Sequence, residues 1–381
     1  MAKHTIRSDH QLAAYQQEID DIVFQLYEVR EDRQVIEESL RSGSGLASSL
    51  NEDDLVQDVE EAMLGNRTLV ANLLSYAVGC VFGRWDLRIA LDPSLAPDLA
   101  DPFAPLPVCS PGMLVGPDAL PAQRDSIASE DWMRARPNVI ALPPDGSVDN
   151  PTIPDSEYPL AVDWDGILVD DPEHDDDIVR RVREVLDLLW GERADAIEGE
   201  ACDLLAVNDL RVYFRNPKRL FDFHIKRYSK SRRKAPIYWL LQSPKRNYGL
   251  WLYYHRLDPD ILFKALKNCV EPKVRLEENR LEEYETRRRS AGTAGREARQ
   301  AERAVKKQEE LLADLREFRD RLERAAELYL RPDLNDGVVL NIAPLHELVP
   351  WKEAKSKWND LLSGKYEWSS IGKQLREKGI V

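Results

Sequence analysis

The chain has 381 residues, of which 43% are hydrophobic and 32% charged, and its formal net charge is −15 at pH 7. No apolar run approaches the ~20 residues that a membrane span needs, so we expect no membrane contact. The start shows no apolar signal region, the four cysteines form no CxxC pair, and the histidines do not fall at metal-ligand spacing. We therefore expect a cytoplasmic protein with buried, reduced thiols and no metal site.

Periodic apolar positions predict helices in the N-terminal region. From Leu12 to Val29 they recur at steps of three and four, which favours one amphipathic bundle helix that runs to about Leu40. Residues 52–90 predict two shorter helices. The second should be buried, because apolar residues lie almost all round it over 69–81.

A change in composition begins at Asp92, where proline becomes frequent. Of the 23 prolines, 14 lie between Pro93 and Pro159, and few apolar positions among them are periodic. We expect a long irregular connection here, with one short helical turn at 131–133.

An acidic run precedes the next predicted helix, which starts at Ile178. Carboxylates are favoured at a helix N-terminus by the helix dipole and by the unpaired N–H groups of the first turn. We therefore interpret the run as helix capping. Its members are Asp170, Asp171, Glu173, Asp175, Asp176 and Asp177.

The segment VDWDGIL at 162–168 has a structural and an enzymatic interpretation. It can be a strand end or turn that leads to the acidic run. It also resembles the first motif of haloacid-dehalogenase-type phosphatases, whose two aspartates serve as nucleophile and general acid; here they would be Asp163 and Asp165. Ile167 replaces the hydroxyl residue of that motif, and no later Lys and paired-Asp motif accompanies it. A P-loop, an EF-hand and a nucleophile elbow are also missing from the sequence.

A basic block lies between Arg215 and Arg246, with eleven Lys/Arg residues and a single acid, Asp222. With this block at +10, the rest of the chain is near −25. Such a block is typical of a contact with a phosphate backbone. The competing interpretation is a solvated basic loop followed by a buried hairpin. The aromatic residues interleaved with the block could stack on bases or simply be core: Tyr228, Tyr238, Trp239, Tyr248, Trp251, Tyr253 and Tyr254.

The C-terminal half predicts two hairpins of different kinds. IYWLLQ and GLWLYY, joined by SPKRN at 243–247, predict a β-hairpin with basic residues at its tip. Two charged helices with heptad-like spacing and a small-residue turn at 290–295 predict an antiparallel helical hairpin. Because its charges alternate in sign, we interpret them as solvated rather than as a second DNA-binding patch. The tail predicts a short strand at 338–342 and a closing helix.

HIKRYSKSRRKAPIYW at 224–239 resembles the hallmark segment of the C-terminal half of large adenine-specific DNA methyltransferases, the type IIG-like enzymes of the BREX and Pgl phage-defence systems. Further segments agree in the same order: EIDDIVFQLYEV (18–29), LLSYAVGCVFGRW (73–85), VDWDGILVDD (162–171), ILFKALKNCVEPKVRLEENRLEE (261–283), PDLNDGVVLNIAPLHELVPWKEAKSKW (332–358) and YEWSSIGKQL (366–375).

Members of that family bind S-adenosylmethionine and methylate N6 of an adenine flipped out of the duplex. Their [DNS]-P-P-[YFW] motif and glycine-rich cofactor loop do not occur in these 381 residues. The resemblance is therefore to the spacer, target-recognition and C-terminal helical parts of such an enzyme.

The expected architecture is α+β and predominantly helical. Its regions are a helical spacer (1–91), a Pro-rich irregular connection (92–157), a mixed α/β target-recognition region with the basic block and the β-hairpin (158–258), a long antiparallel helical hairpin (259–331) and a C-terminal cap (332–381).

The resemblance implies the DNA-binding, target-recognition part of a site-specific N6-adenine DNA methyltransferase of a phage-defence system. We expect this chain alone to methylate nothing and to bind no cofactor, with S-adenosylmethionine bound by a catalytic half or partner. The implied partners are double-stranded DNA and a methyltransferase catalytic subunit or other phage-defence components. The alternative is a protein-interaction scaffold that docks a separate methyltransferase subunit.

Two groups of side chains are the candidate DNA contacts, and no residue is predicted to be catalytic. Those expected to hold phosphates are Lys226, Arg227, Lys230, Arg232, Arg233 and Lys234. Those expected to reach a groove from the hairpin tip are Lys245, Arg246, Asn247 and Tyr248.

Overall fold

The computed structural model describes residues 52–96, 109–124, 127–135, 152–153, 157–228, 234–291 and 295–381. The chain divides into two compact units, Met1–Gly65 and Asn66–Val381, and the helix expected at 12–40 lies outside the described residues. The α-helices are α3 (Glu52–Val81), α4 (Leu87–Leu91), α5 (Glu130–Ala135), α6 (Ile178–Trp190), α7 (Ala194–Leu205), α8 (Leu210–Arg215), α9 (Leu220–Arg227), α10 (Ile261–Lys264), α11 (Glu271–Ser290), α12 (Arg296–Glu327), α13 (Val338–Ile342), α14 (Lys352–Leu362) and α15 (Ser370–Glu377). The strands are β1 (Ile127–Ala128), β2 (Thr152–Ile153), β3 (Ile167–Val169), β4 (Tyr238–Gln242) and β5 (Gly249–Tyr253).

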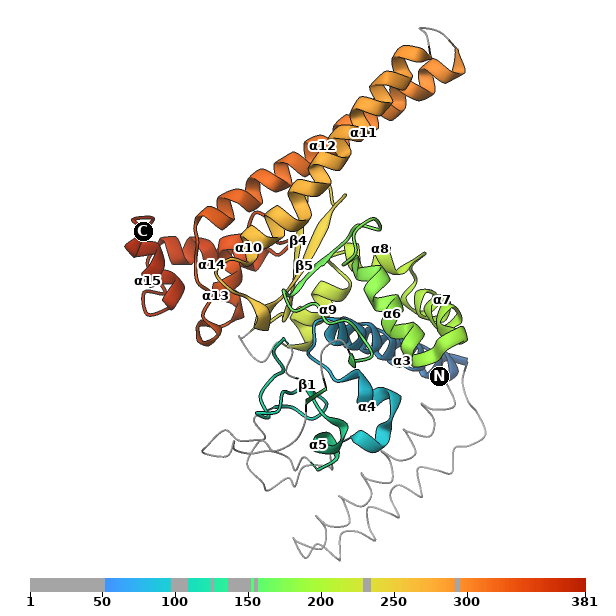
Figure 1. Cartoon of the computed structure of the whole chain (residues 1–381), viewed down its shortest axis with the longest axis vertical. Helices are drawn as coiled ribbons and strands as arrows, with labels where there is room; N and C mark the ends of the chain where they lie inside the picture. Colours follow the sequence, from blue (N-terminus) through green and yellow to red (C-terminus); the bar gives the residue numbers. More distant parts are fainter. Residues whose placement is uncertain are drawn as a thin grey trace, which may run out of the picture. The chain divides into compact units, whose positions relative to one another are not determined.

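A three-stranded antiparallel sheet, in the order β3–β5–β4, lies at the centre of the second unit (Figure 1). β4 and β5 form the predicted hairpin, and β3 pairs with the other edge of β5, so that Trp251 lies between Leu240 and Leu168. Every residue of the three strands is buried. A sheet that is buried on both faces needs helices on both faces, which confirms the predominantly helical α+β class.

Side chains from β5 and its approach alternate between two helical layers. Trp251 faces α9, where its ring centroid is 6.4 Å from that of Phe221. Tyr248, just before β5, faces the other way, and its ring lies 5.9 Å from Phe318 on α12. The aromatic residues interleaved with the basic block are therefore core residues, apart from the partly buried Tyr228.

Two predictions of local structure are wrong. Residues 52–81 form one helix, α3, rather than a short helix followed by a second one. Residues 338–342 form helix α13 instead of a strand. This run is rich in β-branched residues, but hydrogen bonds at its start favour a helix. The carbonyl of Gly337 accepts from the backbone N–H groups of Leu340 and Asn341. The Asn341 side chain also donates to the same carbonyl.

The described parts of the Pro-rich segment carry a small core of their own. β1 pairs with β2, and α5 confirms the helical turn expected at 131–133. The side chains that pack together here include Leu95, Val115, Ala128 and Met133. All four cysteines of the chain are buried, and their thiols are not joined in disulfides, as expected.

α11 and α12 form the predicted antiparallel helical hairpin, which we call the arm (Figure 1). Its first helix is continuous with α10 through a π-helical segment, Ala265–Val270, so the helical run extends from Ile261 to Ser290. The seam between the helices is apolar on α12, where Leu315 and Phe318 are fully buried. The base of the arm packs on the core, and its outer end extends away from the rest of the second unit (Figure 1).

Candidate nucleic-acid interface

A buried carboxylate on α12 holds the loop of the β4–β5 hairpin. Asp314 is 2% exposed and accepts hydrogen bonds from the Ser243 hydroxyl at 2.7 Å, the Lys245 backbone N–H at 2.7 Å and the Asn247 side-chain amide at 2.9 Å. The Ser243 hydroxyl oxygen accepts in turn from the backbone N–H groups of Asn247 and Tyr248. Because hydrogen bonds to an ionised acceptor are strong, the loop is fixed on the helix.

The four residues expected to reach a groove from this loop differ from one another in exposure and in contacts. Lys245 and Arg246 are exposed, and within the described ranges their side chains make no hydrogen bond or ion pair. Arg246 adopts a left-handed backbone conformation, with φ at +61°. The Asn247 amide is held by Asp314. Tyr248 is 2% exposed, so its ring belongs to the core and cannot reach a groove from this position.

Two cations expected to hold phosphates lie at the C-terminal end of α9. Lys226 is exposed and pairs with Asp222 one turn earlier, at 2.7 Å. Arg227 is exposed and donates to the side-chain oxygen of Asn72 on α3. An exposed ion pair is worth little in water, so Lys226 can exchange Asp222 for a phosphate at small cost, and the exposed Arg227 has only an uncharged partner, Asn72, in this contact.

The remaining members of the phosphate set contribute less to this surface. Lys234 pairs with Glu353 of α14 at 2.6 Å, so much of its charge is compensated within the protein. The other three lie outside the described residues: Lys230, Arg232 and Arg233.

The structure does not bring the two candidate groups together. His224, near the end of α9, has its ring centroid 4.6 Å from that of Tyr238, the first residue of β4. The anchored loop follows the last residue of β4. Five residues of strand lie between, or about 17 Å at 3.4 Å per residue. The α9 cations and the loop cations therefore occupy opposite ends of the hairpin.

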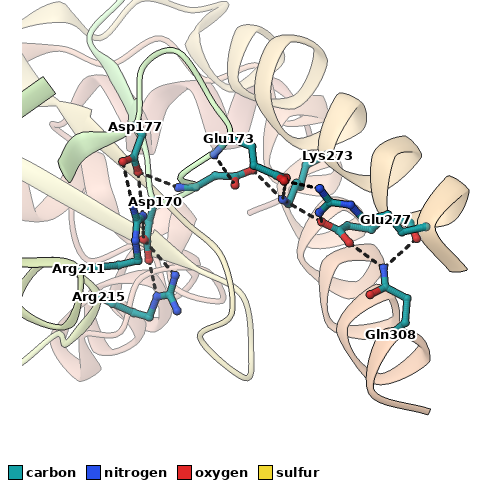
Figure 2. Close-up of polar contacts among 10 residues, drawn as sticks. Asp170, Glu173, Asp177, Arg211, Arg215, Lys273, Glu277 and Gln308 are labelled. Carbon is teal, nitrogen blue, oxygen red and sulfur yellow. Dashed lines mark hydrogen bonds and ion pairs between the residues drawn. The ribbon is translucent and has the colours of Figure 1, made fainter. Parts of the chain in front are cut away.

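The acidic run is used for internal pairing (Figure 2). Asp177 is the N-cap of α6 and accepts from the backbone N–H of Arg180 at 3.1 Å, so the capping role predicted for the run is confirmed for this residue. Asp170, 2% exposed, pairs with Arg211 at 2.8 Å and Arg215 at 2.5 Å. The first cation of the basic block is thereby neutralised.

A further cation joins the acidic run to the arm (Figure 2). Lys273, on the first turn of α11, has its ammonium group 2.9 Å from Asp171, 2.8 Å from Glu277 and 3.2 Å from Glu173. Burial alone would lower the pKa of Lys273, but the hydrogen bonds to Glu277 and Asp171 outweigh burial and raise that pKa. The network therefore fixes the base of the arm against the loop before α6.

The geometry of VDWDGIL supports the structural interpretation. Asp163 accepts backbone N–H groups of Asp165 at 3.1 Å and Ile167 at 2.8 Å, and so closes the turn before β3. Asp165 pairs with Lys264 at 3.3 Å.

Within the ranges that the structure describes, no group of three or more His, Cys, Asp or Glu side chains could hold a metal ion. In the same residues no helix is long and apolar enough to cross a membrane.

Two residues that organise this surface were not singled out by sequence reasoning. Asp314 precedes Leu315 of the predicted apolar stripe, and an acid beside a buried stripe was the only available signal. Lys273 lies in a strongly charged helix, where its burial could not be distinguished from exposure. The role of each residue depends on a hydrogen-bond or ion-pair partner that is far away in the sequence.

The chain is similar to part of two larger enzymes. Over 209 residues, 49% of this chain, it is 29% identical to the adenine-specific methyltransferase BrxX of Escherichia coli O9:H4 (strain HS). Over 352 residues, 88% of this chain, it is 23% identical to the adenine-specific methyltransferase PglX of Lacticaseibacillus casei (strain Zhang). The matches cover 16% and 22% of those relatives, so this chain spans only a minor part of their length. No family model matches the chain.

Proposed function

We propose that this chain provides DNA target recognition for an adenine-specific DNA methyltransferase of a phage-defence system of the BREX or Pgl type. The observation that carries the proposal is the similarity to an adenine-specific methyltransferase over 88% of the chain. The segment that resembles the region C-terminal to the catalytic domain contains the hairpin and the basic block. Cofactor binding and methyl transfer from S-adenosylmethionine belong to a catalytic part outside these 381 residues.

The hairpin loop is the proposed reader of DNA sequence. Lys245 and Arg246 project from a loop that is tied to α12 through Asp314, and a rigid support is what base recognition requires. Arg and Lys donate readily to O6 and N7 of guanine in the major groove. Lys226 and Arg227, at the other end of the hairpin, are proposed to contact phosphates and to position the duplex.

Selection from a random duplex pool tests the loop directly. The wild-type chain should enrich a defined sequence, whereas the double substitution Lys245→Gln/Arg246→Gln should remove that preference. A matched control is Lys352→Gln/Lys355→Gln, which removes two exposed lysines of α14 that have no acid partner among the described residues. The control should select the same sequence as the wild type.

Two results would contradict this function. One is a hairpin variant that selects the same sequence as the wild-type chain. The other is a wild-type chain whose affinity for duplex DNA does not fall steeply with salt. Phosphate contacts release counterions, so such contacts require a steep fall. Capture of a methyltransferase subunit without any DNA binding would favour the scaffold instead.

A further inference from the structure

The outer end of the arm concentrates unpaired positive charge in an acidic protein. Between Arg287 and Lys307 there are eight Lys/Arg residues and only two acids, Glu297 and Glu302. All eight cations are exposed. They are Arg287, Arg288, Arg289, Arg296, Arg299, Arg303, Lys306 and Lys307.

The cations at the base of the same two helices are paired. Arg280 pairs with Glu277 at 2.8 Å, and Arg316 pairs with Glu278 at 2.8 Å. At the outer end, the described residues include one ion pair that involves these eight cations, between Arg289 and Glu285 on α11. Six of the eight make no side-chain hydrogen bond, ion pair or ring contact within the described ranges: Arg288, Arg296, Arg299, Arg303, Lys306 and Lys307. The alternation of charge that the sequence suggests therefore does not extend to the outer end.

Four of these side chains form a stripe along α12. Arg296, Arg299, Arg303 and Lys307 follow one another at steps of three, four and four, which places them on one face of the helix. Val305, which is 2% exposed and lies in the seam with α11, is on the opposite face. Like charges at these spacings destabilise a helix, so the stripe is not explained by the stability of the arm.

The length of the stripe fits a nucleic-acid backbone. Eleven residues of helix rise about 16 Å, and one strand of a duplex carries a phosphate about every 3.4 Å of its axis, so about five phosphates lie alongside. Protein interfaces are anchored chiefly by Trp, Tyr and Arg side chains that are buried in well-packed pockets. In 287–291 and 295–307 no large apolar side chain is exposed. Charge without an apolar anchor favours a phosphate backbone over a protein partner.

We propose that the outer end of the arm is a second DNA-binding surface, which contacts the backbone of duplex DNA irrespective of base sequence. The choice of DNA as the polyanion rests on the proposed function. The hairpin loop reads bases, and the arm adds sequence-independent affinity at a separate place.

The test compares two fourfold glutamine variants of the full chain that lose the same charge. The arm variant is Arg296→Gln/Arg299→Gln/Arg303→Gln/Lys307→Gln. The control is Lys352→Gln/Lys355→Gln/Lys373→Gln/Lys378→Gln, at exposed lysines of the C-terminal cap without an acid partner in the described ranges. Glutamine keeps a good helix propensity, and circular dichroism verifies that both variants retain the wild-type helix content.

Affinity for a random-sequence duplex is measured between 50 and 200 mM salt. Each lost phosphate contact should flatten the slope of log K against log salt by about 0.9. Over this range, the loss of affinity caused by salt should then be smaller by a factor of about 3.5. The arm variant should therefore flatten the slope by about 2 to 4, whereas the control should change it by less than about 1. An arm variant whose slope and affinity match the control overturns the proposal.

The hairpin variant Lys245→Gln/Arg246→Gln separates this proposal from the proposed function. If the hairpin variant loses sequence preference while the arm variant binds like its control, the arm proposal alone is wrong. If the arm variant loses affinity while the hairpin variant selects the wild-type sequence, the hairpin function alone is wrong. A wild-type chain that binds no duplex at all contradicts both.

Discussion

The side-chain amide of Gln308 on α12 donates to both the backbone carbonyl of Glu277, at 2.9 Å, and its carboxylate, at 2.7 Å. Both residues are buried, at 7% and 2% exposure. A polar pair therefore interrupts the apolar seam of the arm. Buried polar residues between paired helices can fix their axial register, and we expect this pair to do so for α11 and α12.

Gln308→Leu should destabilise the protein although it makes the seam more apolar. The substitution removes a donor from the buried Glu277 carboxylate, which should cost about 1 to 3 kcal/mol. Gln300→Leu, at an exposed position of the same helix, should change the stability by no more than about 0.5 kcal/mol. Urea unfolding measures both, and equal stabilities for the two variants would contradict the role given to the pair.

Lys273→Met should be among the most damaging single changes in the arm. It leaves the buried Asp171 carboxylate without its cation and removes one of the two cations, Lys273 and Arg280, that pair with the buried Glu277, at a cost of about 3 to 5 kcal/mol. Lys267→Met removes an exposed ion pair with Glu271 and should cost less than about 1 kcal/mol. Thermal unfolding of the two variants provides the measurement. A loss for Lys273→Met no larger than that of its control would mean that the network at the arm base contributes little.

Asp314→Ala should loosen the hairpin loop. Three donors lose their acceptor, and we expect a loss of about 2 to 3 kcal/mol in the free energy of unfolding. The amide hydrogen of Lys245, which donates to Asp314, should also exchange faster with solvent. Glu310→Ala, at an exposed acid of the same helix, is the control and should leave that exchange rate unchanged. Unaltered exchange in Asp314→Ala would show that the loop is held by other contacts.

His224 should make the stability depend on pH. It is fully buried, with Nε2 3.1 Å from the Ser75 hydroxyl. Burial, with smaller contributions from Arg84 and Arg227, lowers the pKa of His224 to about 3. An unfolded histidine titrates near 6.5, so below about pH 6.5 the unfolded chain binds more protons than the native one. Stability should therefore fall as the pH falls from 6.5 towards 3.

Between pH 7 and pH 5, where most carboxylates stay ionised, this histidine should account for a loss of about 2 kcal/mol. In His224→Gln the difference in unfolding free energy between the two pH values should shrink by that amount. An equally large difference in the variant would show that His224 is not the group responsible.

Local patterns predicted the elements whose partners are near in sequence. The hairpin of β4 and β5 follows from two apolar runs and a short turn, and Asp177 caps α6 as an acid before an apolar helix should. The pairing of β3 with β5 joins segments about 80 residues apart, and no local pattern specifies that choice. The run at 338–342 was misassigned because its β-branched residues favour strands, whereas the bonds to Gly337 start a helix.

The candidate site was predictable in its charge but not in its geometry. Sequence located the cations of the basic block, yet whether a cation is free depends on acids elsewhere in the chain. Asp170 neutralises Arg215, and Glu353 compensates Lys234. The side chains of Lys245 and Arg246 remain free because the loop is held through the side chains of Ser243 and Asn247 and through the backbone N–H of Lys245.

The attachment of the hairpin loop to Asp314 also sets a distance. Along α12, Asp314 is seven residues from Lys307 and eighteen from Arg296, or about 10 and 27 Å at 1.5 Å per residue. On a duplex with about 3.4 Å between base pairs, those lengths correspond to about three to eight base pairs. If both surfaces contact one duplex, α12 therefore sets the distance along the DNA between the bases contacted by the hairpin loop and the phosphates contacted by the arm. Adding or removing a turn of α12 should change that distance.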